Sequence, residues 1–277
     1  MIPANFNYHK ATSLQEAIAL SQELGEEAKY MSGGHSLLPM MKLRFATPEH
    51  IIDISKIEGL SYIKEEDNML KIGALTTQSE MEHNTLIKEN YPIMGDAIWL
   101  TADPSVRNCG TIGGNIAHGD AANDQPALML AMRATIIAEG GEGQKAIPID
   151  EFFHGFYMTA LEPGDILTEI QIPKAKKGSG CAYHKVERKV GDYATAGVAV
   201  HVELDNNGVC EEIGIGLTNV SAVPMRLERG EEILRGKKIT EDLIEQVGQI
   251  ASEDCEPESD LRGSEAYKRS IMNTITK

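Results

Sequence analysis

The sequence has no pair of cysteines at the close spacing that metal clusters use. Its four cysteines stand singly, at positions 109, 181, 210 and 255. Zinc sites and iron–sulfur clusters usually take two thiolates from one short turn, so we expect this chain to bind no metal. We also expect no disulfide framework, and we interpret the cysteines as free, structural thiols of a cytosolic chain.

Basic residues and long apolar runs are also scarce. There are 26 Lys and Arg against 42 Asp and Glu, a formal net charge of −16. Such a charge repels phosphate backbones and anionic lipid, which argues against nucleic-acid and membrane-surface binding. No apolar run reaches the roughly 18–20 residues of a membrane span. Residues 1–10 lack a signal-peptide pattern, so we expect a cytoplasmic, non-exported and non-spanning protein.

The hydrophobic fraction of 42% and the charged fraction of 25% are those of a folded globular protein. A chain of 277 residues is long enough for two or three compact units. The stretch 174–180, rich in Lys, Gly and Ser, resembles a linker. We therefore predict a first domain over residues 1–175 and a second over residues 178–277.

Helix and strand signals share the first domain. Ser13 and Glu16 predict a capping box for a helix over 13–25, and Thr77 and Glu80 predict another for a helix to about residue 89. The Gly- and Asn-rich segment 103–125 has little amphipathic period, and we expect it to be irregular. Further helices are expected over 92–102, over 126–132 and from 150, and strands at 28–31, 51–54, 60–73 (a hairpin turning at 65–68), 134–138, 145–149 and 165–172.

The second domain has the pattern of a small α+β unit. Three antiparallel strands are predicted at 181–187, 196–204 and 209–218. Asn207-Gly208 is a strong hairpin signal between the last two strands. Helices are predicted near 225–235, 240–252 and 264–275.

Two glycine loops carry the most chemical information. They are Ser32-Gly33-Gly34-His35-Ser36 and Thr111-Ile112-Gly113-Gly114-Asn115. Glycine permits positive φ and close approach of the backbone to a ligand, and successive N–H groups can then converge on an anion. Two such loops could hold a pyrophosphate from both sides. The alternative is that each glycine pair only makes a tight turn.

Both loops differ from the common nucleotide-binding fingerprints. Neither is G-x-G-x-x-G, which argues against a Rossmann dinucleotide site. Neither is G-x-x-x-x-G-K-[ST], which excludes a P-loop. A pyrophosphate site here would therefore belong to another fold.

The longer runs around these loops, residues 32–44 and 107–117, resemble the two flavin loops of the medium subunit of molybdenum hydroxylases. The resemblance covers nearly the whole chain. It is strongest to the carbon monoxide dehydrogenase medium-chain type, through His35 and the run Met40-Met41-Lys42-Leu43-Arg44. The family also includes the FAD-binding part of xanthine dehydrogenase.

The resemblance implies an α+β protein that binds FAD. The first domain would be a vanillyl-alcohol-oxidase-type FAD-binding domain of two α/β subdomains, about 1–55 and 56–175, with FAD in the groove between them. The second would be a C-terminal domain of the carbon monoxide dehydrogenase flavoprotein type, a three-stranded antiparallel sheet with helices that covers the flavin.

The resemblance also implies a set of cofactor-binding residues. It assigns both glycine loops to the pyrophosphate and adjoining groups, Lys29 and Leu161 to the adenine, and Asp124, Lys185 and Tyr193 to the flavin. No catalytic side chain and no metal ligand are implied. The complete set is Lys29, Ser32, Gly33, Gly34, His35, Ser36, Leu37, Ala102, Val106, Gly110, Thr111, Gly113, Gly114, Asn115, Ala117, His118, Asp120, Asp124, Leu161, Lys185 and Tyr193.

Each assignment has a simpler alternative. Lys29 and Lys185 could be solvated, and His118 could be a loop histidine without a role. Asp120 and Asp124 could cap the helix expected near Pro126. Tyr193 could fill the core.

The implied function is an electron-transfer subunit of a molybdenum-containing hydroxylase or dehydrogenase. FAD would take electrons from [2Fe-2S] clusters of a small iron–sulfur subunit and pass them to an external acceptor, which could be NAD, quinone, ferredoxin or oxygen. The substrate would be oxidised on a large molybdenum-cofactor subunit, in a heterotrimer. The alternatives are a self-contained flavin oxidase and a flavin-free assembly module of the same fold.

Overall fold

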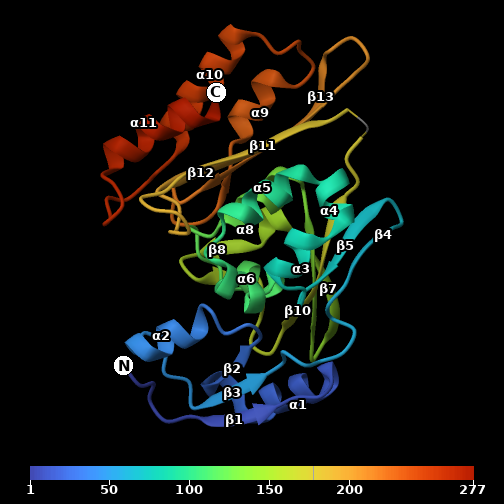
Figure 1. Ribbon diagram of the computed structural model, residues 1–277, viewed down its shortest axis with the longest axis vertical. Coiled ribbons are helices and arrows are strands. Elements are labelled where there is room, and N and C mark those ends of the chain that lie inside the picture. The colour runs from blue at the N-terminus through green and yellow to red at the C-terminus, as the bar shows by residue number, and fades with distance from the viewer. Residues whose placement is uncertain (177) are drawn as a thin grey trace.

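The computed structural model describes residues 1–176 and 178–277. Of the four sheets in the described residues, the three larger ones follow one another along the longest axis of the molecule (Figure 1). The N-terminal sheet lies at the bottom of this view, a five-stranded sheet with its helices lies in the middle, and the C-terminal sheet and helices lie at the top. The expected α+β class is confirmed. The predicted linker 174–180 contains Lys177, which lies outside the described residues.

The N-terminal unit is a parallel sheet of order β1-β3-β2. A small core around Ala17, Ile18 and Ile52 joins α1 to this sheet. Ser13 caps α1 as predicted, but the Glu16 carboxylate accepts from the N–H of Thr12 rather than from that of Ser13. The elements are β1 (Asn7–Lys10), α1 (Leu14–Leu24), η1 (Gly25–Glu27), β2 (Ala28–Met31), α2 (Leu37–Leu43) and β3 (His50–Asp53).

The central unit is an antiparallel sheet of order β4-β5-β10-β6-β7, with helices packed on it. The predicted hairpin turns at Asp67 and Asn68, which both have positive φ. The elements are β4 (Ile63–Glu66), β5 (Met69–Gly73), α3 (Gln78–His83), α4 (Thr85–Asn90), α5 (Pro92–Leu100), α6 (Pro104–Cys109), α7 (Ile112–Ala117), α8 (Asp124–Ala131), β6 (Thr135–Gly140), β7 (Gly143–Pro148), η2 (Ile149–Glu151), β8 (Phe153–Gly155), β9 (Met158–Thr159) and β10 (Ile166–Pro173).

Three expectations about this unit are wrong. The helix expected from 150 is only the three-residue 3-10 turn η2, which the strand β8 follows. The segment 103–125 is mostly helical, because the side chains of Asp103 and Thr111 cap the short helices α6 and α7. Each has only six residues, too few for an amphipathic period to be visible in the sequence. The single helix expected from Thr77 to about residue 89 is two helices, since Asn84 ends α3 and caps α4.

The C-terminal unit has one strand more than expected. Its antiparallel sheet has the order β11-β12-β13-β14, and the fourth strand is a two-residue segment beside Gly216 and Leu217 of β13. Met225 and Arg226 of this segment were expected to begin a helix, which instead begins at Glu228. The elements are β11 (Gly180–Val186), β12 (Ala196–Leu204), β13 (Cys210–Thr218), β14 (Met225–Arg226), α9 (Glu228–Leu234), α10 (Glu241–Asp254) and α11 (Glu265–Thr276).

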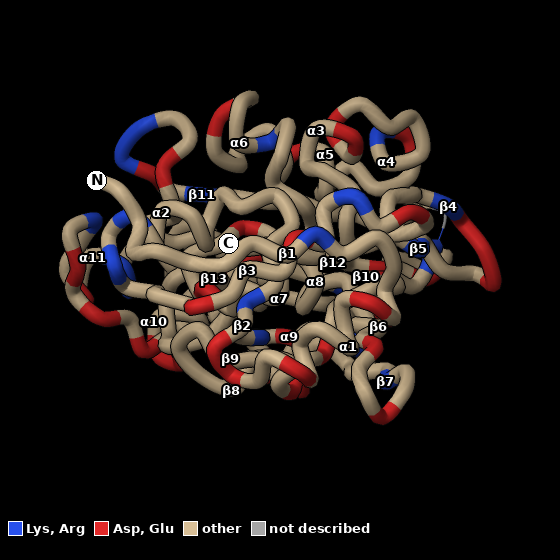
Figure 2. Tube along the Cα trace, turned by 90° about the horizontal axis from the view of Figure 1, so that it is seen from below, with Lys and Arg blue, Asp and Glu red and all other residues tan. Residues whose placement is uncertain are grey.

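The acidic residues lie mainly at the periphery. Figure 2 shows them along α10 and at the tip of the β4–β5 hairpin. Acidic residues outnumber basic ones by 42 to 26 in the whole chain. The large cores, by contrast, lie beneath the five-stranded sheet and between the C-terminal sheet and its helices.

The capping box at Thr77 offers a first test of the fold. The Thr77 hydroxyl accepts from the Glu80 N–H at 3.1 Å, and the Glu80 carboxylate accepts from the Thr77 N–H at 2.7 Å. Thr77→Ala should destabilise the protein by about 1 kcal/mol. In a chain of this size that lowers the thermal midpoint by about 2–4 °C. Thr77→Ser keeps the hydroxyl and should melt as the wild type does; equal melting of the Ala variant would show that the cap contributes nothing.

Candidate functional site

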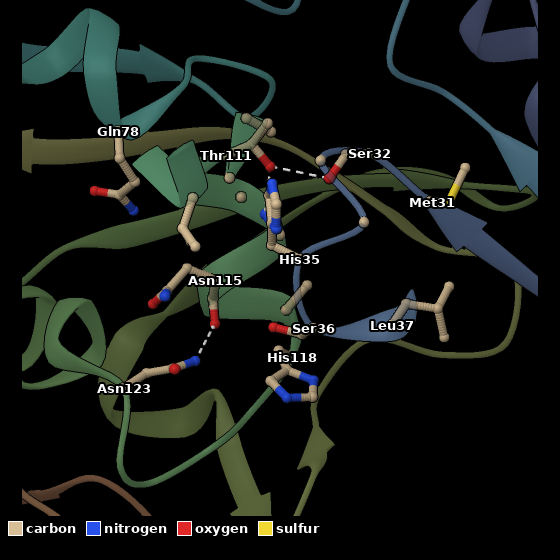
Figure 3. Close-up of a pocket in the computed structure, with 18 of the residues that line it drawn as sticks. Met31, Ser32, His35, Ser36, Leu37, Gln78, Thr111, Asn115, His118 and Asn123 are labelled. Atoms are coloured by element: carbon tan, nitrogen blue, oxygen red, sulfur yellow. Dashed lines mark hydrogen bonds between the residues drawn. The ribbon is translucent and has the colours of Figure 1, made fainter. Parts of the chain in front are cut away.

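A cleft of about 640 Å³ opens between the three units. That size lies within the usual range for small-molecule and cofactor sites. Residues 29–37 of the N-terminal unit form one wall, and residues 101–118 of the central unit form the opposite wall. Residues 191–193 of the C-terminal unit complete the lining. The two glycine loops therefore face each other across the cleft (Figure 3).

The first glycine loop presents free backbone donors to this cleft. The N–H groups of residues 33–37 donate to no acceptor within the described ranges 1–176 and 178–277. The loop turns at Gly34, whose φ of +71° is a conformation that favours glycine. Consecutive free N–H groups in such a turn form an anion-binding concavity. This part of the prediction agrees with the geometry.

The second glycine loop differs from the expected arrangement. The N–H groups of residues 112–115 donate to oxygen atoms of Thr76, Ala74 and Thr111. These donors are therefore already used, and the idea of equivalent N–H donors on both sides is wrong. Packing of the loop against the β5–α3 connection is the physical reason, since buried N–H groups take the nearest carbonyl acceptors.

Contact between the two loops explains why Gly33 and Gly114 are glycines better than positive φ does. The Ser32 and Thr111 hydroxyls are hydrogen-bonded at 2.9 Å (Figure 3). A Cβ at Gly33 would lie 2.0 Å from the Cys109 carbonyl oxygen, and a Cβ at Gly114 would lie 2.9 Å from the Ser32 hydroxyl. Neither Gly33 nor Gly114 has positive φ, so that part of our expectation is wrong. Both glycines are needed because the two loops touch.

Two polar side chains of the cleft have an unpaired atom. Asn115 Oδ1 and Gln78 Nε2 are buried and have no hydrogen-bond partner within the described part of the chain. Asn123 donates to the Asn115 carbonyl at 3.0 Å, which holds the loop after α7 in place. A buried polar atom without a partner is costly, and a polar ligand would supply the partner.

A buried ion pair closes the end of the cleft at α8. Asp124, on α8, accepts from the Tyr183 hydroxyl at 2.6 Å and from the Lys185 ammonium at 3.0 Å. The Lys185 side chain is fully buried and also donates to the Leu100 carbonyl at 2.9 Å. Burial raises the pKa of Asp124 despite the nearby ammonium, and it raises the pKa of Tyr183 as well. This cluster joins the C-terminal sheet to the central unit.

Aromatic rings line the mouth of the cleft. The His118 and Tyr157 rings lie 4.8 Å apart, and the Tyr157 hydroxyl lies 3.4 Å from the Asp120 carboxylate. Burial lowers the pKa of His118 and favours its neutral form. Burial, with a further effect of Asp120, raises the pKa of Tyr157 to about 12. Tyr193 also lines the cleft and is 41% exposed, so it does not fill the core.

All but two of the predicted site residues line the cleft. The exceptions are Asp120, which contacts Tyr157, and Lys185, which lies behind Asp124. Lys185 is buried, so the alternative that it is solvated is wrong, whereas Lys29 is exposed at the edge of the cleft. Asp124 is the first residue of α8 but makes no cap; the N-cap is Asn123, which forms no side-chain capping bond.

Several residues of the cleft were not predicted. They include Gln78, Thr101, Asn123, Tyr157 and Asp165. They come from separate elements that long-range packing brings together, and no local motif marks any of them except Gln78. The one usable signal was Gln78, which follows the Thr77 cap and faces the second loop.

Among residues 1–176 and 178–277, no group of three or more His, Cys, Asp and Glu side chains has the geometry of a metal site. Within the same residues, no helix has the length and apolar character needed to cross a membrane.

Comparison with known proteins shows to which family the chain belongs. Residues 4–175 match the family described as "FAD binding domain in molybdopterin dehydrogenase". The chain belongs to this family. Residues 181–277 match the "CO dehydrogenase flavoprotein C-terminal domain". The match to this family confirms the resemblance and confirms FAD as the cofactor. The free N–H donors and the unpaired polar atoms of the cleft fit a ligand of this kind.

Individual relatives align with this chain over nearly their whole length. The carbon monoxide dehydrogenase medium chain of Hydrogenophaga pseudoflava is 46% identical over 277 residues, which are 100% of this chain and 96% of the relative. The glyceraldehyde dehydrogenase medium chain of Sulfolobus acidocaldarius is 37% identical over 276 residues, 100% of this chain and 97% of the relative.

A solved structure agrees with these alignments. The carbon monoxide dehydrogenase of Hydrogenophaga pseudoflava that lacks the Mo-pyranopterin moiety contains a chain that matches with a TM-score of 0.97 at 45% identity, over 100% of this chain and 96% of that chain. The protein is therefore an FAD-binding medium subunit of the molybdenum hydroxylase type. The family is one of oxidoreductase subunits that act in multi-subunit complexes.

Proposed function

We propose that this chain is the electron-transfer flavoprotein of a three-subunit molybdenum hydroxylase. One observation carries the proposal: five consecutive free N–H groups of residues 33–37 face a second loop in a cleft large enough for a cofactor. When bound, FAD supplies the redox chemistry by accepting electrons from one carrier and giving them to another. The chain contributes binding, orientation and exclusion of water.

The roles of the residues follow from their contacts. The N–H groups of residues 33–37 bind the pyrophosphate, and the hydroxyls of Ser32 and Thr111 hold the loops together around it. Asn115 and Gln78 supply the unpaired oxygen and amide nitrogen to the polar parts of the cofactor. The proposed set is the one predicted from the sequence, with Asp120 acting through Tyr157 and Lys185 acting through Asp124.

The finer architecture is part of the same proposal. We assign residues 1–175 to a vanillyl-alcohol-oxidase-type FAD-binding domain with subdomains at about 1–55 and 56–175. We assign residues 178–277 to the covering domain. The separate cores of the three units support this division. Four free thiols in the described residues support a cytoplasmic location.

The partners are a small iron–sulfur subunit and a large molybdenum-cofactor subunit. Relatives of similar length are named medium chains, of a carbon monoxide dehydrogenase and of a glyceraldehyde dehydrogenase. Since such different substrates occur with similar medium chains, we place substrate oxidation on the large subunit. The external acceptor is NAD, quinone, ferredoxin or oxygen.

Co-expression with a small iron–sulfur subunit and a large molybdenum-cofactor subunit tests the proposal. The three chains should co-elute on size exclusion and carry FAD, and the substrate of the complex should reduce that FAD. After the partners are removed, dithionite should still reduce the flavin but the substrate should not. Turnover of a small substrate by the lone chain, without co-elution, would support the oxidase alternative instead.

Metal analysis of the isolated chain provides a second test. We expect neither stoichiometric iron nor stoichiometric molybdenum, because the cysteines are scattered and the described residues form no metal-ligating cluster. Elemental analysis of the lone chain beside the complex is the measurement. Iron that stays with the lone chain at one or more atoms per chain would contradict the assignment of the clusters to a partner.

A further inference from the structure

Tyr193 enters the cleft on a loop that joins β11 to β12. Its ring lines the cleft but is 41% exposed, so burial in a core does not fix its orientation. An exposed tyrosine on a loop can adopt several side-chain rotamers. Something other than core packing must therefore hold the ring against the cleft.

The Arg262 guanidinium lies over the Tyr193 ring. Its Cζ is 5.4 Å from the ring centroid, within the range of a cation–π contact. The same guanidinium donates to the Asp192 carboxylate at 3.3 Å, while that carboxylate accepts from the Tyr193 N–H at 2.9 Å. Arg262 thus contacts the Tyr193 ring and also the Asp192 carboxylate, which holds the Tyr193 backbone.

The connection before α11 holds Arg262 in its place. The Arg262 N–H donates to the Asp260 carboxylate at 2.7 Å, and that carboxylate also accepts from the buried Lys268 ammonium at 2.9 Å. Arg188 donates to the other oxygen of Asp192 at 2.9 Å. Residues about 70 positions away in the sequence thereby fix the loop that carries Tyr193.

The opposite side of the loop is fixed by a backbone contact. Gly191 has a φ of +79°, and a Cβ there would lie 2.6 Å from the Ala102 carbonyl oxygen on the facing wall of the cleft. The loop is therefore anchored on one side at Ala102 and on the other at Arg262. Between these two anchors the ring of Tyr193 lines the cleft.

We propose that Arg262 is a positioning residue for the flavin site, which acts by holding the Tyr193 ring in the orientation that contacts bound FAD. The proposal rests on the proposed function of the cleft. It assigns to the C-terminal connection 257–263 a role in cofactor binding that no local motif of the sequence indicates. Arg262 does not line the cleft and acts only through its neighbour.

The test compares Arg262→Met with Arg262→Lys in the co-purified complex. Met removes the charge while keeping most of the volume, and we expect about 5-fold weaker FAD binding, the usual size of a partly exposed cation–π contact. Lys keeps the charge and should bind FAD within about 2-fold of the wild type. Arg229→Met is the matched control, because Arg229 pairs with Asp254 on the far helices and should change nothing.

A double-mutant cycle separates positioning from general stability. In a Tyr193→Leu background, Arg262→Met should weaken FAD binding no further, because its effect passes through the ring. The emission of the bound flavin should also rise in Arg262→Met, since a loosened tyrosine ring quenches it less. Equal, additive losses in both backgrounds would overturn the inference. A wild-type complex without FAD would instead overturn the proposed function.

Discussion

Gly33→Val is expected to abolish FAD retention in a chain that still folds. The first atom that any side chain adds at this position would lie 2.0 Å from the Cys109 carbonyl oxygen and 2.9 Å from the Gly110 Cα. Those neighbours are backbone atoms, which cannot rotate away as a side chain can. The first glycine loop must therefore move away from the second, and the Ser32–Thr111 hydrogen bond is lost with it.

The loss should be much larger for binding than for stability. Residues 33–37 form a surface loop outside the three cores, so most of the packing survives. Their free N–H groups, however, converge on a ligand only while the loop keeps its shape. We expect more than about 100-fold weaker FAD binding, the combined effect of several lost hydrogen bonds to a charged group. Flavin content after gel filtration and equilibrium titration with FAD measure it.

Substitutions at two further glycines provide the controls. At Gly114 the added Cβ would meet the Thr111 and Ser32 hydroxyls at 2.8 and 2.9 Å, and these are side-chain atoms that can move. Gly114→Ala should therefore weaken FAD binding less than Gly33→Ala, whereas the bulkier Gly114→Val should lose FAD. Gly95→Ala adds a Cβ with nothing within 4 Å and should bind FAD normally. Full flavin occupancy in Gly33→Val would contradict the loop-contact account.

The sequence was sufficient to predict those parts of the structure that depend on a few consecutive residues. Both glycine loops and the hairpin at Asp67 and Asn68 are contiguous signals, because turn chemistry depends on a few adjacent residues. The sequence could not reveal that the N–H groups of residues 112–115 are already bonded. That fact depends on the approach of the β5–α3 connection, which only the tertiary packing determines.

The same reasoning explains the missed residues and elements. Tyr157 and Gln78 reach the cleft from segments that are far apart in the chain, so no spacing connects them. The helices α6 and α7 are shorter than two turns, and their local signals are limited to their N-caps and to Pro104 at the start of α6. The two-residue strand β14 forms only because Leu217 offers it a partner. Contacts of this kind override weak local propensity.

Lys185→Met should be the most destabilising single change at the junction of the central and C-terminal units. The Lys185 side chain is fully buried, 3.0 Å from Asp124 and 3.3 Å from Glu187. Removing the ammonium leaves two carboxylates close together, in a region where burial already raises the pKa of Asp124. Breaking a buried pair in this way typically costs about 3–5 kcal/mol. We expect the thermal midpoint to fall by about 6–20 °C.

A compensating change distinguishes this electrostatic explanation from a simple loss of packing. Asp124→Asn in the Lys185→Met background removes the buried negative charge and keeps an acceptor for the Tyr183 hydroxyl, so it should restore more than half of the lost stability. Lys176→Met is the matched surface control, because Lys176 is 62% exposed beside Glu203 and Glu211 and should change the midpoint by less than about 2 °C. Differential scanning calorimetry of the four proteins makes the comparison. If the double variant melts no higher than Lys185→Met alone, the lost contacts of the lysine stem, rather than the unpaired charge of Asp124, account for the instability.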